Sequence, residues 1–452
     1  MPAQAPLDDV PDPQGSSIYN HTSSAPPNHS HSPSPQMSDI SNDLAALSIN
    51  EGTRSPAQNL PPEIIIEIVL ELVETQWDIA WTTAAVCRSW RFAALNITGR
   101  LWSRICVPVG AIPSSLVRCT LPNQRIDTWL QRGGPTAPLQ LDLRSNSPLI
   151  SNAFSDALNT TGAMNRVVEM RLSIVSREQW RMRTPAPNLR VLWLMGPVEK
   201  GASFVLLSAA LQGLFGYPSF CRPSTSLKKL HLRCLKIDRS CRVFLQHITH
   251  LSLFKCTDAG SGASLGLVPG CSANLQVLSL RECEFPFDVI LGGTQLPKLH
   301  SLSIGPNSFL WADTTASFGQ LSAPSLQTLS VSASQLQSVS HTKYQSLKHL
   351  TVVLQIMRAG SLQHWIRKLD GWFKAPGLLT ITLVLMHIMN SIGSTPALAS
   401  PGSFFGQSVE RVVVRLPPSA AATARMECEN LKGVWAEVGK ELMIEPLALS
   451  EY

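Results

Sequence analysis

The segment 227–253, LKKLHLRCLKIDRSCRVFLQHITHLSL, decides the fold because it contains two copies of one pattern. Each copy reads Leu/Ile-x-x-Leu-x-Leu, first as LKKLHL at 227–232 and then as ITHLSL at 248–253. Alternate side chains of an extended chain point to opposite faces, so the last two leucines of each copy face the same side. The pattern therefore predicts one short strand per copy, with an apolar face.

The same pattern recurs along most of the chain. Further copies lie at 189–194, 275–280, 299–304, 326–331, 347–352 and 378–383, with weaker ones at 167–172 and 409–414. The copies that begin at 227, 248, 275, 299, 326 and 347 are 21 to 27 residues apart, which matches the period of leucine-rich repeats. A single copy cannot cover its own leucines, so neighbouring copies stack and share one core. We therefore expect an α/β fold, an irregular leucine-rich-repeat solenoid with a parallel sheet on its concave face.

Three copies carry a small polar residue three positions after their last apolar residue: Cys256, Cys283 and Asn307. A side chain of this kind is suited to hydrogen-bond the backbone where it turns inside the coil. We assign residues 108–418 to the repeat domain and 419–452 to a C-terminal capping segment, with a closing helix over 419–441. The stretch 108–160, with a strand over 139–143, is either an N-terminal cap or a degenerate first repeat.

Composition restricts the function. The net charge is only +6 and 15% of the residues are charged, which argues against nucleic-acid binding, a function that needs a clustered basic face. The ten cysteines include no Cys-x-x-Cys pair, so neither a metal site nor another cofactor is expected. The longest apolar stretches, 64–73 and 378–389, are shorter than the roughly 20 residues that span a bilayer. With no signal peptide at the polar N-terminus, we expect a cytoplasmic or nuclear protein.

Residues 1–57 are dominated by Ser, Pro, His, Asn and Gln, and we predict that they are disordered because they hold too few apolar residues to offset chain entropy. One possible catalytic pattern occurs later, GASLG at 262–266, which matches Gly-x-Ser-x-Gly. A nucleophile needs a strand before Ser264 and a helix after it, whereas here a Gly/Ser loop precedes it and Pro269-Gly270 follows. We therefore expect no enzyme activity, and a hydrolase that uses Ser264 is a weak alternative.

Residues 58–107 form a separate unit. The run NLPPEIIIEIVLELVE begins at Asn59, and its two prolines suit the start of a helix that is apolar over most of its surface. Two more short helical patterns follow, one with Trp77 and Trp81 and one with Trp90 that stops near Gly99. Three short helices have little core of their own, so their apolar faces favour contact with another protein.

The pieces LPPEI at 60–64, VCRSWR at 86–91 and LW at 101–102, in this order, resemble an F-box followed by leucine-rich repeats, as in fungal F-box proteins. The middle helix, WDIAWTTAA at 77–85, departs from the Leu-rich stretch that members often carry. The resemblance implies binding to a Skp-type adaptor and, through it, to a cullin–RING ubiquitin ligase. The residues assigned to the Skp-type adaptor are Leu60, Pro61, Pro62, Ile64, Ile65, Ile68, Val86, Trp90, Leu101 and Trp102. The alternative is that six of them, Leu60, Ile64, Ile68, Val86, Trp90 and Trp102, form the core of a helical cap on the repeats.

Outward positions of the repeat strands are the candidates for substrate binding: Trp193, Lys229, His231, Arg233, His250, Phe254, Arg281 and His349. An acidic or phosphorylated segment would suit the basic members, and the alternative is an ordinary solvated face. Together these features predict a non-catalytic substrate-recognition adaptor of an SCF-type cullin–RING ubiquitin ligase. A repeat scaffold that acts outside a ubiquitin ligase is the alternative.

Overall fold

The structure is a computed structural model. It describes the chain from Leu60 to Leu447 with gaps. The described residues are 60–72, 79–96, 101–107, 121–144, 148–174, 186–197, 205–207, 211, 226–237, 247–258, 273–283, 295–305, 321–336, 344–358, 369, 372, 376–389, 409–417, 425, 428–429, 432–433, 435–436 and 439–447. The predicted disordered tail, Asn307 and Ser264 lie outside these residues.

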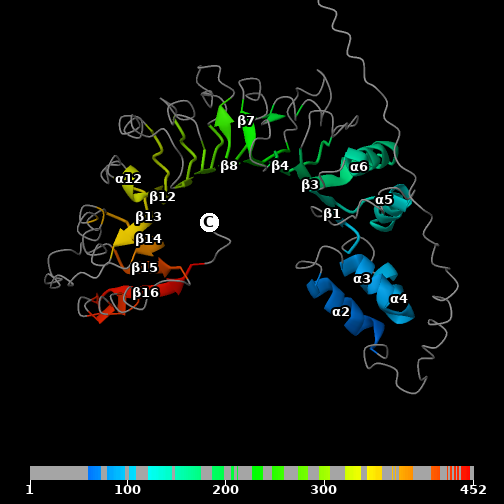
Figure 1. Ribbon diagram of the computed structural model, residues 1–452, viewed down its shortest axis with the longest axis horizontal. Coiled ribbons are helices and arrows are strands. Elements are labelled where there is room, and N and C mark those ends of the chain that lie inside the picture. The colour runs from blue at the N-terminus through cyan, green and yellow to red at the C-terminus, as the bar shows by residue number, and fades with distance from the viewer. Residues whose placement is uncertain are drawn as a thin grey trace, which may run out of the picture. The chain divides into compact units, whose positions relative to one another are not determined.

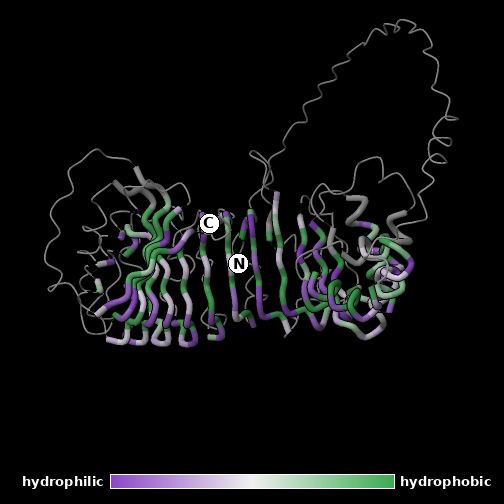
Figure 2. Tube along the Cα trace, turned by 90° about the horizontal axis from the view of Figure 1, so that it is seen from below, coloured by the Kyte–Doolittle hydropathy of each residue, from purple (hydrophilic) through white to green (hydrophobic). Residues whose placement is uncertain are grey.

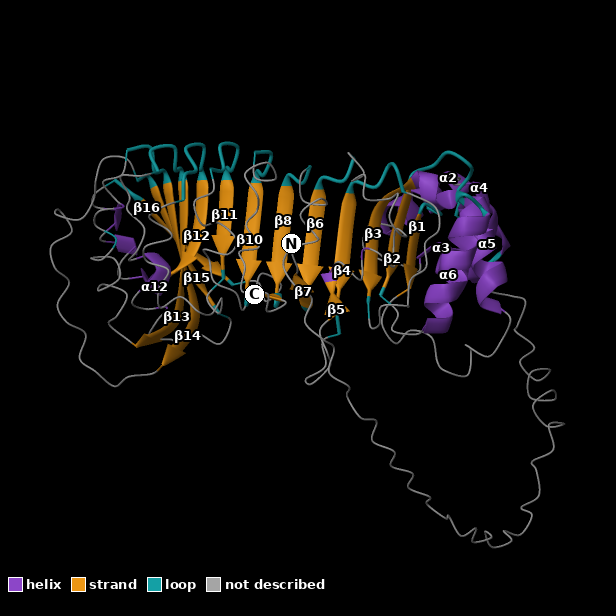
Figure 3. Cartoon of the chain, turned by 90° about the horizontal axis from the view of Figure 1, so that it is seen from above, coloured by secondary structure: helices purple, strands orange, loops and turns teal. Residues whose placement is uncertain are grey.

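The main element is one 13-stranded sheet in which every neighbouring pair is parallel and the strands follow chain order (Figures 1 and 3). Its strands are β1 (Arg104–Val107), β2 (Leu139–Leu143), β3 (Val167–Ser173), β4 (Val191–Met195), β6 (Lys229–Arg233), β8 (His250–Phe254), β10 (Val277–Arg281), β11 (Ser301–Ile304), β12 (Thr328–Ser332), β13 (His349–Arg358), β14 (Thr380–Met389), β15 (Arg411–Leu416) and β16 (Glu441–Pro446). The sheet bends along its length, and its strands line the inner side of the bend (Figure 1). This arrangement confirms the predicted leucine-rich-repeat fold class.

Smaller elements complete the fold. A second, three-stranded sheet contains β5 (Val205–Leu206), β7 (Leu235–Ile237) and β9 (Thr257–Asp258). The helices are α2 (Pro62–Leu72), α3 (Ile79–Val86), α4 (Arg88–Asn96), α5 (Leu121–Arg132), α6 (Pro148–Thr160), the 3₁₀ turn η2 (Ala163–Arg166) and α12 (Ala333–Leu336). No described helix is long and apolar enough to cross a membrane.

The repeat leucines form the core. Hydrophobic and hydrophilic residues alternate along the strands (Figure 2), and the inward positions stack in register, as Leu230 on Leu251 and Leu251 on Leu278. Every apolar residue of the predicted pattern is buried, and Leu227, at 7%, is the most exposed of them. Because each fully buried leucine contributes ~1.5–3 kcal/mol, the shared core is the main source of stability in the array.

The sheet extends beyond both ends of the segment assigned to the repeats, residues 108–418. Strand β1 lies inside the segment assigned to the F-box, yet it pairs with β2 and opens the sheet. The strand predicted at 139–143 is β2 itself, so this stretch is part of the array. At the other end, β16 pairs with β15 beyond residue 418. The described residues at 425, 428–429, 432–433 and 435–436 are helical and precede β16, so they lie between two strands of the sheet and do not close the array as predicted.

Cys256 and Cys283 lie next to the turns that follow two central strands of the sheet. Cys234, Lys255 and Glu282 directly follow β6, β8 and β10, and all three have left-handed backbones with φ of 53°, 51° and 49°. Next to two of these turns, the thiol of Cys256 donates to the carbonyl of Leu232 at 3.5 Å, and the thiol of Cys283 donates to the carbonyl of Leu253 at 3.4 Å. This confirms the predicted role of the two cysteines in bonding the turning backbone.

The helical unit is joined to the array through Trp102. Its indole Nε1–H donates to the carbonyl of Ala94 in α4 at 2.9 Å, and the guanidinium of Arg132 in α5 lies 4.8 Å from the ring centroid. The side chains of Ile65 and Val69 in α2 belong to the same buried cluster as the repeat leucines. The three helices and the repeats therefore share one continuous core.

Candidate functional site

The helical unit carries most of the exposed large apolar side chains. Ile64, Val86, Phe92 and Leu95 are 47%, 51%, 62% and 39% exposed. Among the described residues, the only other exposed large hydrophobic side chain is Leu379 in the repeats, at 36%. Exposed apolar surface that gathers on one unit of a protein is typical of an interaction site.

The ten residues predicted to contact a Skp-type adaptor divide into two groups. Ile65, Leu101 and Trp102 are at most 1% exposed and pack inside the joint between the helices and the repeats. We therefore reassign these three residues from the adaptor surface to the core. The other seven reach the surface and stay predictions: Leu60, Ile68 and Trp90 are half-buried, and Pro61, Pro62, Ile64 and Val86 are exposed. Of the residues in the helical-cap alternative, Trp102 is buried in the core and Leu60 and Trp90 pack against it, whereas Ile64 and Val86 are exposed.

Phe92 and Leu95 were not among the predicted residues. They belong to α4, whose inner face contains the buried Ala93 and Ala94 and the half-buried Trp90. The signal that identifies Phe92 and Leu95 is the presence of apolar residues outside that inner face. A helix with apolar residues on two sides needs a second partner.

The predicted substrate-binding residues all lie at outward positions of the sheet, in three rows set by the strand register. The first row contains Lys229, His250 and His349, the middle row contains Trp193 and His231, and the last row contains Arg233, Phe254 and Arg281. Lys229, Arg233, Arg281 and His349 are exposed, and the other four are half-buried. Their placement on one face is as predicted, and their binding role stays a prediction.

The two aromatic residues do not offer free ring faces. Trp193 lies between the guanidinium of Arg171, 5.0 Å from its ring centroid, and the imidazole of His231, which stacks on it at 3.6 Å. Phe254 contacts Arg233 and Lys255, whose charged groups lie 4.8 and 5.3 Å from its ring centroid. A partner on this face therefore meets polar and cationic groups around both rings.

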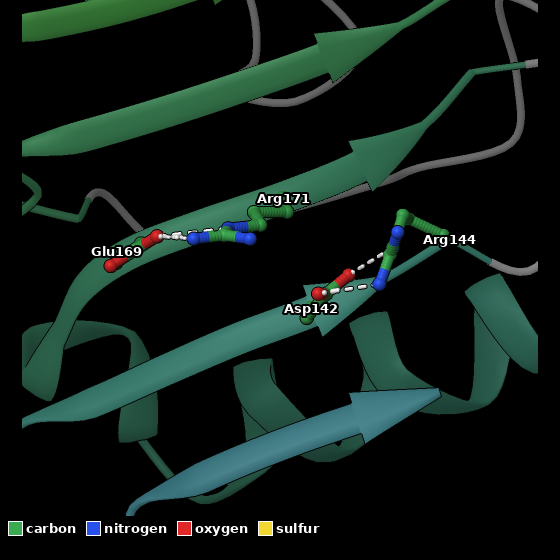
Figure 4. Close-up of polar contacts among 4 residues, drawn as sticks. All are labelled: Asp142, Arg144, Glu169 and Arg171. Carbon is green, nitrogen blue, oxygen red and sulfur yellow. Dashed lines mark hydrogen bonds and ion pairs between the residues drawn. The ribbon is translucent and has the colours of Figure 1, made fainter. Parts of the chain in front are cut away.

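Acidic residues occur at the outward positions near the two ends of the sheet, and each has a basic partner. Asp142 accepts from Arg144 at 2.7 Å, and Glu169 forms an ion pair with Arg171 at 2.8 Å (Figure 4). At the other end, Arg415 in β15 pairs with Glu445 in β16 at 3.0 Å, and Arg411 pairs with Glu441. Between them, no Asp or Glu occupies an outward position of the strands of the 13-stranded sheet from β4 to β14. The middle of the face is therefore neutral or basic.

Two histidines of this face, His231 and His250, have a lowered pKa. Burial lowers the pKa of His231 from its usual 6.5 to about 4, and the cations Lys229 and Arg171 add to the effect. Burial and Lys229 also lower the pKa of His250. At neutral pH, His231 and His250 therefore add no positive charge to that of Lys229, Arg233 and Arg281.

Residues 57–108 match the family model described as F-box-like. One similar solved structure is an internalin from Listeria monocytogenes strain 4b F2365, which is 14% identical, covers 76% of this chain and 99% of its own, and superposes with a TM-score of 0.30. No curated protein matches the sequence. Among the described residues, no group of three His, Cys, Asp or Glu side chains is placed to hold a metal ion.

Proposed function

We propose that this protein is a non-catalytic substrate-recognition adaptor of an SCF-type cullin–RING ubiquitin ligase. The observation that carries the proposal is the exposed apolar set Ile64, Val86, Phe92 and Leu95 on a segment that matches the F-box-like family model. F-box and leucine-rich-repeat units act typically as binding modules. The helices bind a Skp-type adaptor, and the repeats bind the protein to be modified.

The mechanism is proximity. Holding a substrate lysine near the charged ubiquitin carrier raises its effective concentration at the thioester, so the protein itself needs no catalytic group. The shared core supports this role, because α4 is fixed to the first repeat through Trp102 and Arg132. A continuous connection of this kind limits the positions that a bound substrate can sample.

The chemistry of the repeat face favours an acidic or phosphorylated substrate segment. Lys229 and Arg233 project from β6 and Arg281 projects from β10, with β8 between the two strands, and carboxylate or phosphate oxygens form strong hydrogen bonds with such cations. The test is a charge reversal at these three positions. Recovery of substrates from cells should fall while recovery of the Skp-type adaptor is unchanged, and undiminished substrate recovery would contradict this part of the proposal.

Recovery of a cullin separates a ligase subunit from a scaffold that acts elsewhere. The full-length chain should co-purify with a Skp-type adaptor and a cullin, and the half-life of captured partners should lengthen when the chain is removed. Recovery of the Skp-type adaptor without cullin, together with unchanged partner half-lives, would favour the scaffold.

A further inference from the structure

Six neighbouring strands place a hydroxyl residue at one shared register position in the middle outward row. The strand pairing aligns Ser252 with Ser279, then Ser303 and Ser330, then Thr351 and Thr382. We call this set the hydroxyl row. All six side chains are half-buried on the outward face, which leaves part of each accessible. The row is thus a continuous strip of small, uncharged hydrogen-bonding groups.

Larger side chains flank the hydroxyl row, and cations lie beyond one of its ends. At β8 and β10 larger side chains flank it, His250 and Phe254 on one strand and Val277 and Arg281 on the next. Beyond Ser252, the middle row continues with His231, which is stacked on Trp193. Lys229 and Arg233, on either side of His231, are exposed and place positive charge at this end of the row.

The length of the row fits a short extended peptide. Strands lie ~4.8 Å apart, so the five intervals of the row cover about 24 Å. An extended chain advances ~3.3–3.6 Å per residue, so about seven residues cover the same distance. Each hydroxyl both donates and accepts, so the row can serve the N–H and C=O groups of a peptide backbone.

We propose that the hydroxyl row binds an extended peptide segment of about seven residues whose acidic end meets Lys229 and Arg233. The charge of the face selects this occupant, because no outward position of the 13-stranded sheet from β4 to β14 is acidic, and the exposed cations Lys229 and Arg233 lie beyond one end of the row with Arg281 beside Ser279. Sugars and bases bind by stacking on aromatic rings, and both rings of this face are already covered by side chains of the protein. The inference rests on the proposed function, since the segment belongs to the substrate.

The test uses the full chain bound to a Skp-type adaptor and three pools of fluorescent synthetic peptides of about nine residues, long enough to cover the row. One pool has two Asp residues at its N-terminal end, one has them at its C-terminal end, and one has none; the other positions carry mixed uncharged residues. One acidic pool should bind roughly tenfold more tightly than the neutral pool. Equal binding of all three pools would contradict the proposed contact between an acidic peptide end and Lys229 and Arg233.

Variants separate the hydroxyl row from general charge attraction. The triple variant Ser279→Leu/Ser303→Leu/Ser330→Leu fills the row and should lower the affinity for the preferred pool roughly tenfold or more. The matched triple change to Ala should lower this affinity by a smaller factor. Should the Leu variant not fold, the Ala variant alone decides. Undiminished peptide binding by a folded variant would overturn the proposal. The proposal would also be overturned if the protein bound glycans on an array and did not bind the peptides. Normal recovery of cullin beside absent peptide binding would refute this inference and leave the proposed function intact.

Discussion

The imidazole of His231 lies flat on the indole of Trp193, with ring centroids 3.6 Å apart and planes within 8° of each other. The two residues occupy the same register position on neighbouring strands, and Arg171, one strand earlier, covers the other side of the indole. The stack therefore joins three repeats across the outward face. It also closes one end of the hydroxyl row with a neutral ring.

The protonation of His231 should affect stability in acid. Because the folded chain lowers the pKa of His231 from 6.5 to about 4, the unfolded chain takes up this proton first as the pH falls. Stability should therefore decrease from about pH 6.5 towards pH 4. The matched variant His231→Phe keeps an aromatic ring on Trp193 but cannot titrate, so its stability should fall less steeply in urea unfolding over this range. Parallel curves would show that His231 is not held neutral.

A second pH effect concerns Cys283 at the alkaline end. Burial raises the pKa of its thiol from 9.0 to about 11, so between these values the unfolded chain loses a proton that the folded chain keeps. Stability should fall as the pH rises through this window, and more steeply in the wild type than in Cys283→Ala. Unfolding curves of the two proteins across the window measure the difference. An identical slope in both would argue against a protonated, hydrogen-bonded thiol.

Gly196 should not tolerate a side chain. A Cβ at this position would collide with the backbone carbonyl of Cys234 in the next repeat, where the amide of Gly196 already donates to the carbonyl of Arg233 at 2.7 Å. Gly196→Ala should therefore destabilise the chain by about 1–3 kcal/mol or more. Gly433→Ala is the control, because a Cβ there meets nothing within 4 Å in a helical stretch, and it should be neutral or slightly stabilising. Thermal unfolding compares them, and equal effects would contradict the close approach at Gly196.

Trp102 should matter for stability and not for contact with a Skp-type adaptor. Trp102→Phe removes the Nε1–H that the carbonyl of Ala94 accepts, which should cost about 1–3 kcal/mol because the site is buried. Affinity for the Skp-type adaptor, measured well below the unfolding temperature, should stay within about twofold of the wild type, a difference of under ~0.5 kcal/mol. A large loss of affinity in a stable variant would indicate that Trp102 does contact the Skp-type adaptor.

The sequence was sufficient to predict the repeat strands, because buried leucines recur at a fixed spacing, and the same spacing located Cys256 and Cys283. It could not separate Ile64 from Ile65, since α2 is apolar over most of its surface and only packing decides which side chain is covered. It could not show that Arg171 and Arg233 cover aromatic rings, because those contacts depend on the register of strands more than 20 residues apart. The sequence did not indicate the strands β1 and β16, because RICV in β1 and ELMIEP in β16 lack the full repeat pattern.

The affinity of the purified chain for a purified Skp-type adaptor, measured by titration calorimetry, is the decisive experiment. We predict that Ile64→Asp/Phe92→Asp weakens binding by at least about 100-fold, because each large apolar side chain buried at an interface contributes ~1.5–3 kcal/mol. The matched control Leu379→Asp changes an exposed apolar residue of the repeats and should bind like the wild type. Absence of binding by the wild type, or equal losses in the double variant and the control, would contradict a docking role for these helices.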